Sequence, residues 1–212
     1  MSARVLRAAD FAGEASVSRE TLARLETYAA LVRKWQPRLN LIGPNTVNDI
    51  WGRHMLDSAQ IFPHLPAGPV LDAGSGAGFP GMVLALMSLD DPRRGPFHLV
   101  ESDTRKCVFL SEVARATHAP AIIHNARVEA IPPFAVASIV SRALAPLDRL
   151  LPLVEPFIGP DTECFFLKGR GVQEELTRAN RDWRMRVERI RSVTDPAGVL
   201  LRIGEVKRAG AE

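Results

Sequence analysis

A glycine-rich turn is the clearest chemical signal in this sequence. The string PVLDAGSGAGFPG at 69–81 starts with a short apolar run and then has glycines at positions 74, 76 and 78. Such a run is typical of a buried parallel strand, and Pro80 suits the first turn of a following helix. Because glycine lets the backbone turn sharply and approach a ligand closely, we expect a nucleotide-type cofactor where this strand ends.

Two details of the turn indicate which cofactor binds there. The dinucleotide fingerprint has its third glycine three residues after the second, and this position holds Phe79. Asp72 precedes the turn, where its charge would repel a pyrophosphate but could bind a positively charged amino-acid group. Both features favour S-adenosylmethionine (SAM) over NAD, and a tight turn without a ligand is the alternative.

Polar residues after the next two strands could bind the rest of this cofactor. Glu101 ends the run FHLVE, about 25 residues after the turn, where a carboxylate can accept hydrogen bonds from ribose hydroxyls. The alternative is that Glu101 helps to start a helix beside Asp103. After the third strand, the backbone of Val128 and the side chain of Glu129 could bind the adenine edge, although a short polar loop need not bind anything.

Two cations end the fourth and fifth predicted strands. Arg142 and Lys168 would lie at the carboxyl edge of a parallel sheet, where open α/β folds bind their ligands. Burying an arginine is costly unless it is paired, so we predict an active-site role for Arg142, with a structural salt bridge as the alternative. Lys168 suits a phosphate contact, and a solvent-facing loop is the alternative.

The segment 46–62 has polar residues on the inward face of a predicted helix. His54 and Ser58 share the stripe of its apolar residues, and this pattern indicates a lid over the site. Arg53 and Asp57 have the spacing of an i,i+4 ion pair. For His54 alone, a core histidine with satisfied ring nitrogens is the simplest interpretation.

Patterning along the chain predicts the elements that position these residues. Residues 1–15 look frayed, Ser18 caps a helix to Trp35, and Thr46 with Asp49 forms a capping-box start for a helix to Phe62. Strands are predicted at 70–73, 97–101, 121–124, 136–141 and 163–168, and helices at 80–88, 104–117, 147–157 and 171–182. Regular alternation implies a parallel sheet with helices on both faces. A turn at 195–198 joins an antiparallel hairpin of 185–193 and 198–206.

Composition limits the class of protein. With 212 residues, 46% hydrophobic and 24% charged, the chain has the make-up of a globular protein. It has no apparent membrane span or signal peptide, so we expect a cytoplasmic protein. Its two cysteines, Cys107 and Cys164, are predicted to be buried thiols, and no Cys/His spacing suggests a metal. A net charge of +3, from 27 basic and 24 acidic residues, is compatible with nucleic acid.

The motifs together resemble a known family. In order, KWQPRLNLIG, WGRHMLDSAQIFPHL, VLDAGSGAGFPGMVLAL, ESDTRKCVFL, NARVEAI, VSRALAPL and FLKGRG are similar to the bacterial RsmG (GidB) family, over roughly residues 20–204. The resemblance implies methyl transfer from SAM to N7 of a guanine in the 530-loop region of 16S ribosomal RNA. It also implies a class I SAM-dependent methyltransferase fold, here a Rossmann-like α/β domain at 65–212 with an N-terminal helical extension, 1–64, packed on it.

Site residues and partners follow from the same resemblance. The family's SAM contacts fall on Gly74, Phe79, Val128, Glu129 and Arg142, and the fold logic adds Gly76, Gly78 and Glu101. The expected partner is 16S rRNA or the small ribosomal subunit, bound by a monomer with no metal. Guanine N7 carries no proton, so the reaction needs alignment and not a general base. Arg142 and Lys168 are therefore the catalytic candidates, as groups that orient the base through O6 or a flanking phosphate.

Two other functions agree with the turn alone. One is a SAM-dependent methyltransferase that acts on a small molecule or a protein, against which only the family motifs argue. The other is a non-catalytic regulator that binds NAD.

Overall fold

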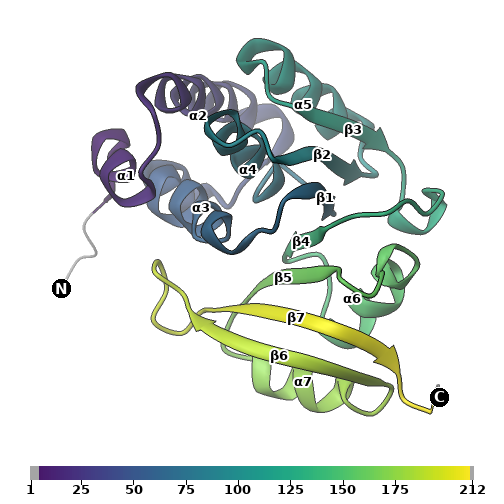
Figure 1. Ribbon diagram of the computed structural model, residues 1–212. Coiled ribbons are helices and arrows are strands. Elements are labelled where there is room, and N and C mark those ends of the chain that lie inside the picture. Colours follow the sequence, from purple (N-terminus) through teal and green to yellow (C-terminus); the bar gives the residue numbers. More distant parts are fainter. Residues whose placement is uncertain (1–4, 211–212) are drawn as a thin grey trace.

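The computed structural model describes residues 5–210, which form a seven-stranded sheet between two layers of helices (Figure 1). The strand order is β3-β2-β1-β4-β5-β7-β6. The five parallel strands are β1 (Gly68–Ala73), β2 (Arg94–Glu101), β3 (Ala121–Asn125), β4 (Ser138–Arg142) and β5 (Glu163–Lys168). Strand β7 (Val199–Arg208) runs antiparallel between β5 and β6 (Trp183–Arg191). This confirms the predicted parallel sheet and its C-terminal hairpin.

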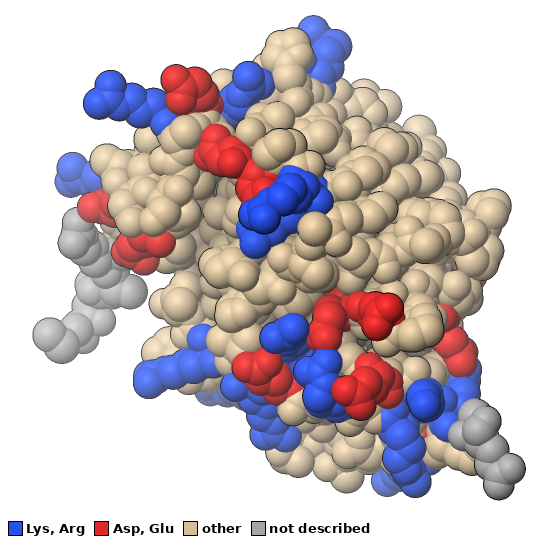
Figure 2. Space-filling view, viewed as in Figure 1, with Lys and Arg blue, Asp and Glu red and all other residues tan. Residues whose placement is uncertain are grey.

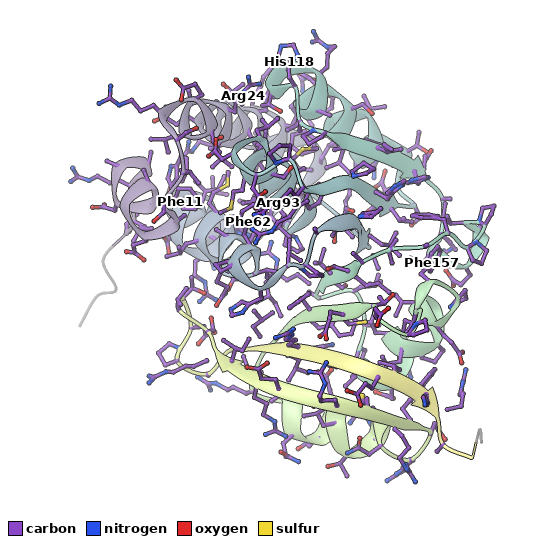
Figure 3. The ribbon with its side chains drawn as sticks, in the orientation of Figure 1. Phe11, Arg24, Phe62, Arg93, His118 and Phe157 are labelled. Atoms are coloured by element: carbon purple, nitrogen blue, oxygen red, sulfur yellow. The ribbon has the colours of Figure 1, made fainter. Side chains whose placement is uncertain are left out.

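Neighbouring residues of each central strand pack on opposite faces of the sheet. Val70 and Phe165 belong to one core, whereas Leu71 and Phe166 belong to the other. The first core lies under α2 (Arg19–Leu39), α4 (Gly81–Met87) and α5 (Thr104–Thr117), and the second under α6 (Leu147–Val154) and α7 (Val172–Ala179). Burial on both faces explains why these strands read as continuous apolar runs. Figure 3 shows Phe11 and Phe157, one from each core, on opposite sides of the molecule.

The prediction that residues 1–15 are frayed is wrong for the described part of that segment. Residues Ala8–Ala15 form helix α1, and residues 1–4 lie outside the described part of the chain. Phe11 is fully buried and packs on Trp51, with ring centroids 5.3 Å apart. A single well-buried aromatic side chain holds this short helix to the core, and sequence periodicity over eight residues gives little sign of it.

The helix predicted at 46–62 is helical but broken into four pieces. These are the 3-10 helix η1 (Pro44–Asp49), the π-helix η2 (Trp51–Leu56), a single turn α3 (Asp57–Ala59) and the 3-10 helix η3 (Phe62–His64). The predicted capping box is absent, because the Thr46 hydroxyl donates to the Gly43 carbonyl at 2.8 Å. The inward stripe is confirmed, since His54 and Ser58 are buried. Single π-helical turns are frequent at functional sites.

Helix α2 fastens the N-terminal helices to the sheet. The Tyr28 hydroxyl donates to the Ala77 carbonyl at 2.5 Å, and its ring stacks on Phe79. Arg24 donates to the carbonyl of Thr117 at the end of α5, and Figure 3 shows Arg24 near His118 there. Helices before β1 therefore share one core with the sheet. The division of the chain at residue 64 stays a prediction.

The remaining helices of the described residues are three short 3-10 helices, η4 (Ser88–Asp90), η5 (Val128–Ala130) and η6 (Glu155–Phe157). Helix η5 lies between β3 and β4. Cys107 and Cys164 are buried and free, as expected. Between residues 5 and 210, no helix has the length and apolar character that crossing a membrane requires, and no cluster of side chains there could hold a metal ion.

Candidate active site

The glycine turn joins β1 to α4, and all three of its glycines have a left-handed backbone. The φ angles of Gly74, Gly76 and Gly78 are +72°, +57° and +96°, which confirms that the turn needs glycine. Only Gly76 faces open space, because a Cβ added there meets no atom within 4 Å. A Cβ on Gly74 would clash with Leu144, and one on Gly78 with the Tyr28 hydroxyl. The turn therefore offers bare backbone to a ligand at Gly76.

A cavity of about 350 Å³ opens in front of this turn, at the carboxyl ends of β1, β2 and β4. Its polar lining includes Lys106 and Arg127. It also brings together six of the eight predicted cofactor residues, namely Gly74, Gly76, Glu101, Val128, Glu129 and Arg142. Val128 is the first residue of η5, where the N–H has no partner within the helix. The empty space above Gly76, the Glu101 carboxylate and the Val128 N–H fit a nucleoside-type cofactor such as SAM.

Gly78 and Phe79 do not line this cavity. The ring of Phe79 is buried behind the turn, with centroids 5.2 Å from Tyr28 and 4.9 Å from His54. The Arg142 guanidinium carbon lies 5.1 Å from the centre of the Phe79 ring. In this structure Phe79 supports Arg142 through a cation–π contact, and its predicted cofactor contact would have to come from its backbone.

Glu101 ties the glycine turn to the end of β2. Its carboxylate accepts the Gly76 N–H at 2.8 Å and the Asp103 N–H at 2.7 Å. A carboxylate has about four lone-pair sites, so these two bonds leave acceptor capacity for ribose hydroxyls. The start of α5 has its own cap, because the Asp103 side chain accepts the Arg105 N–H at 2.9 Å. Helix capping therefore does not require Glu101.

Asp72 lies beneath the turn and is fully buried. One oxygen, Oδ2, accepts the Gly81 N–H at 3.0 Å, while Oδ1 has no hydrogen-bond partner. Burial raises the pKa of Asp72 to about 7. Asp72 anchors the start of α4 and does not line the cavity, so its expected contact with the cofactor's amino-acid group is not seen in this geometry.

Arg142 ends β4, as predicted, and is held on three sides. Its Nη1 donates to the Arg53 carbonyl at 3.2 Å and to Asp57 Oδ2 at 3.4 Å, and its Nη2 lies 2.9 Å from His54 Nδ1. The expected ion pair between Arg53 and Asp57 is wrong, because Arg53 instead lies 3.8 Å from Asp195. The structure thus fixes the guanidinium through partners on η2 and α3.

His54 is a neutral hydrogen-bond relay. Since a guanidinium can only donate, His54 Nδ1 accepts from Arg142, and Nε2 donates to the Thr46 hydroxyl at 2.7 Å. Burial and the nearby Arg142 charge lower the pKa of His54 to about 3. Both ring nitrogens are engaged and His54 is 8% exposed, which confirms the interpretation of a core histidine with satisfied ring nitrogens.

Lys168 ends β5, as predicted, but its ammonium is already paired. Nζ lies 2.8 Å from Glu175 Oε2 and donates to the Ala145 carbonyl at 2.8 Å. Its side chain is 7% exposed, so a solvent-facing loop does not describe it. Glu175 also accepts the Leu147 N–H at 2.9 Å. Lys168 and Glu175 together hold the segment 143–147 that follows Arg142.

Comparison of the sequence with known proteins identifies the family of this chain. The sequence model described as rRNA small subunit methyltransferase G (GidB) matches residues 21–198. The chain belongs to this family. A ribosomal RNA small subunit methyltransferase G from Paramagnetospirillum magneticum is 51% identical over 94% of this chain and 96% of its own length. One from Rhodospirillum centenum is 49% identical over 97% of this chain and 94% of its own length.

A comparison with solved structures finds the same fold in a known methyltransferase. A TehB-like SAM-dependent methyltransferase from Corynebacterium glutamicum superposes with a TM-score of 0.57 at 18% identity, covering 83% of this chain and 98% of its own. At this identity the likeness concerns the fold alone. The chain is thus a small subunit methyltransferase G family member with the fold of SAM-dependent methyltransferases, and both predictions are confirmed.

A second cavity of about 250 Å³ adjoins the first in this small subunit methyltransferase G family member. Arg142 lines both cavities. The predicted lid supplies one wall through Arg53 and Asp57, and the β6–β7 turn supplies another. The sequence predicts the β6–β7 turn but assigns no functional role to its residues Thr194 and Asp195. Their polar side chains are the only sequence signal that could have indicated such a role.

Proposed function

We propose that this chain transfers the methyl group of SAM to N7 of a guanine in the 530-loop region of 16S ribosomal RNA. Membership of the small subunit methyltransferase G family supports the reaction and the RNA class. The structural observation that carries the proposal is that one fixed cation, Arg142, lines both cavities. A cofactor in one cavity and an acceptor base in the other would meet at its guanidinium.

The first cavity is the proposed SAM site. Glu101 would accept the ribose hydroxyls, and the Val128 backbone with Glu129 would bind the adenine edge. Gly74 and Gly76 would allow close approach of the cofactor, with Gly78 and Phe79 shaping the turn from behind. Bound SAM supplies an electrophilic methyl group.

Arg142 is the proposed orienting group for the acceptor base. Guanine presents N7 and O6 as neighbouring acceptors, so a guanidinium that donates to O6 would aim N7 at the first cavity. N7 has a free lone pair and no proton, and the reaction therefore needs no general base. His54, neutral and engaged at both ring nitrogens, supports this assignment because it is fitted to hold Arg142 and not to remove a proton.

We propose that Lys168 is a positioning residue. Its ion pair with Glu175 and its bond to the Ala145 carbonyl would keep the segment after Arg142 in place. A direct contact of Lys168 with an RNA phosphate would require it to leave Glu175.

The proposed partner is 16S rRNA or the small subunit, bound by a cytoplasmic monomer. Lys, Arg, Asp and Glu side chains gather together over the β6–β7 hairpin (Figure 2), where Arg186 and Arg202 both pair with Glu163. Such mixed charge is a poor phosphate surface. Exposed Arg127 and Arg170, at the carboxyl edge of the sheet, are better placed for the RNA backbone.

A methyl-transfer assay tests the proposal. Small-subunit RNA from cells that lack the enzyme is incubated with the protein and tritiated SAM, and the labelled nucleoside is identified. The expected product is 7-methylguanosine. Label in another nucleoside, or only in protein or small molecules, would support a different acceptor. Calorimetry with SAM and NAD separates an enzyme of this class from an NAD-binding regulator.

A further inference from the structure

The second cavity has chemistry suited to one particular base. Its walls carry a fixed donor, Arg142, and a carboxylate, Asp195, on the β6–β7 turn. Its volume of about 250 Å³ is below the roughly 300–1,000 Å³ of common ligand pockets. A space of this size suits one planar base better than a stretch of nucleotides.

Arg142 and Asp195 are held in place by contacts with the same two residues, Arg53 and Asp57, or with their neighbours. The Arg53 carbonyl accepts from Arg142 at 3.2 Å, while the Arg53 guanidinium lies 3.8 Å from Asp195. On the other side, Asp57 pairs with Arg142 at 3.4 Å and accepts the Thr194 hydroxyl at 2.6 Å. The turn that carries Asp195 is thus fastened to the same short helices that hold Arg142.

One of the two carboxylate oxygens of Asp195 has no close hydrogen-bond donor. Its Oδ1 accepts the Ala197 N–H at 2.9 Å, which explains this side as a local turn. Its Oδ2 has the long contact with Arg53, between side chains that are 41% and 49% exposed. Exposed ion pairs of this kind contribute little stability. Oδ2 is therefore available to a ligand in the cavity.

A carboxylate is an unexpected group beside an RNA substrate, because it repels phosphates. It is favourable where the ligand presents N–H donors. Guanine has such donors at N1 and at its 2-amino group, on the edge next to O6, whereas adenine has an unprotonated N1 and no 2-amino group.

We infer that Asp195 is a specificity-determining residue, which accepts hydrogen bonds from N1–H and the 2-amino group of the target guanine while Arg142 donates to O6. This inference rests on the proposed function. It assigns the choice of guanine to the C-terminal hairpin, an element outside the cofactor site.

The test compares two small-subunit RNAs that carry guanosine or inosine at the target nucleotide. Inosine keeps N1–H, O6 and N7 but lacks the 2-amino group. The wild-type protein is expected to favour guanosine by roughly 10- to 100-fold in kcat/KM, the effect of one bond to a charged acceptor. Asp195→Asn keeps the acceptor for Ala197 but replaces Oδ2 by a donor. It should lose a similar factor on guanosine, remove the preference over inosine, and leave SAM affinity unchanged.

Glu188→Gln is the matched control, since it makes the same change of charge on the same hairpin without lining the cavity. It should retain the wild-type preference. If Asp195→Asn melts at a lower temperature, Asp195→Ser, which can still accept from Ala197, gives the same comparison. The inference is overturned if the wild-type protein does not distinguish the two RNAs, or if the Asp195 variants keep its preference. If the wild-type protein binds SAM but methylates neither RNA, the proposed function itself fails.

Discussion

Replacing Glu101 by Gln tests the proposed cofactor site at the residue that joins the glycine turn to the end of β2. The carboxylate accepts two backbone N–H groups, from Gly76 and Asp103, and its side chain is buried. An amide has only one oxygen, so at least one of these buried donors would face an NH₂ group. The ribose hydroxyls would also lose a charged acceptor. Each loss is of the order of 1–3 kcal/mol, and we expect SAM binding to weaken by about 1–3 kcal/mol, or roughly 5- to 150-fold.

Isothermal titration with SAM measures this loss, and Asp103→Ala is the matched control. Asp103 caps α5 two residues away but does not line the cavity. Its removal should lower the free energy of unfolding by about 0.5–2 kcal/mol and leave SAM affinity within about twofold of the wild-type value. Equal SAM affinity of Glu101→Gln and wild-type protein would refute the ribose assignment and favour a structural role at the start of α5.

Three further changes test the rest of the site. Gly76→Val puts a side chain into the open space of the cavity at φ +57°, where a β-branched residue is strained. The free energy of unfolding should fall while the circular dichroism spectrum stays near-native, and titration should show SAM binding lost. Unchanged SAM affinity would place the cofactor elsewhere. Lys168→Ala leaves Glu175 without its cationic partner. The free energy of unfolding should fall by about 3 kcal/mol, and methyl transfer should fall far more than SAM affinity. Full activity would remove Lys168 from the mechanism. Burial raises the pKa of Asp72 to about 7 from an ordinary 3.8, so the folded state prefers the protonated acid. Stability should therefore fall as pH rises from about 4 to 7, by roughly 4 kcal/mol at most, and chemical denaturation of Asp72→Asn should show this slope reduced; an identical slope in both proteins would assign it to other groups.

The sequence predicted the sheet well because its strands are buried on both faces. The runs around Leu71 and Phe166 are apolar throughout, so their pattern indicates a buried strand and not a surface one. The glycines of the turn have φ angles that few other residues adopt. The predicted cofactor residues at the ends of β1, β2 and β4 meet because parallel strands end at one edge.

The remaining features depend on contacts between distant segments. Helix α1 is held by Phe11 on Trp51, and Asp57 pairs with Arg142 instead of its helical neighbour Arg53. Lys168 is predicted to contact a phosphate, but in the structure it forms an ion pair with Glu175 on α7. Asp195 was predicted only as part of a turn. No local pattern specifies such pairs, because each partner comes from an element whose place is set by the whole fold.

The central claim is that N7 of a guanine receives the methyl group, aligned by Arg142 without a general base. The most direct test is a single-turnover assay with tritiated SAM on small-subunit RNA that carries 7-deazaguanosine at the target nucleotide. This analogue replaces N7 by a carbon and keeps O6, N1–H and the 2-amino group. The account predicts that the analogue RNA still binds but takes up no label, while the guanosine RNA is labelled as 7-methylguanosine. Transfer of label to the 7-deazaguanosine nucleotide at a comparable rate would contradict it.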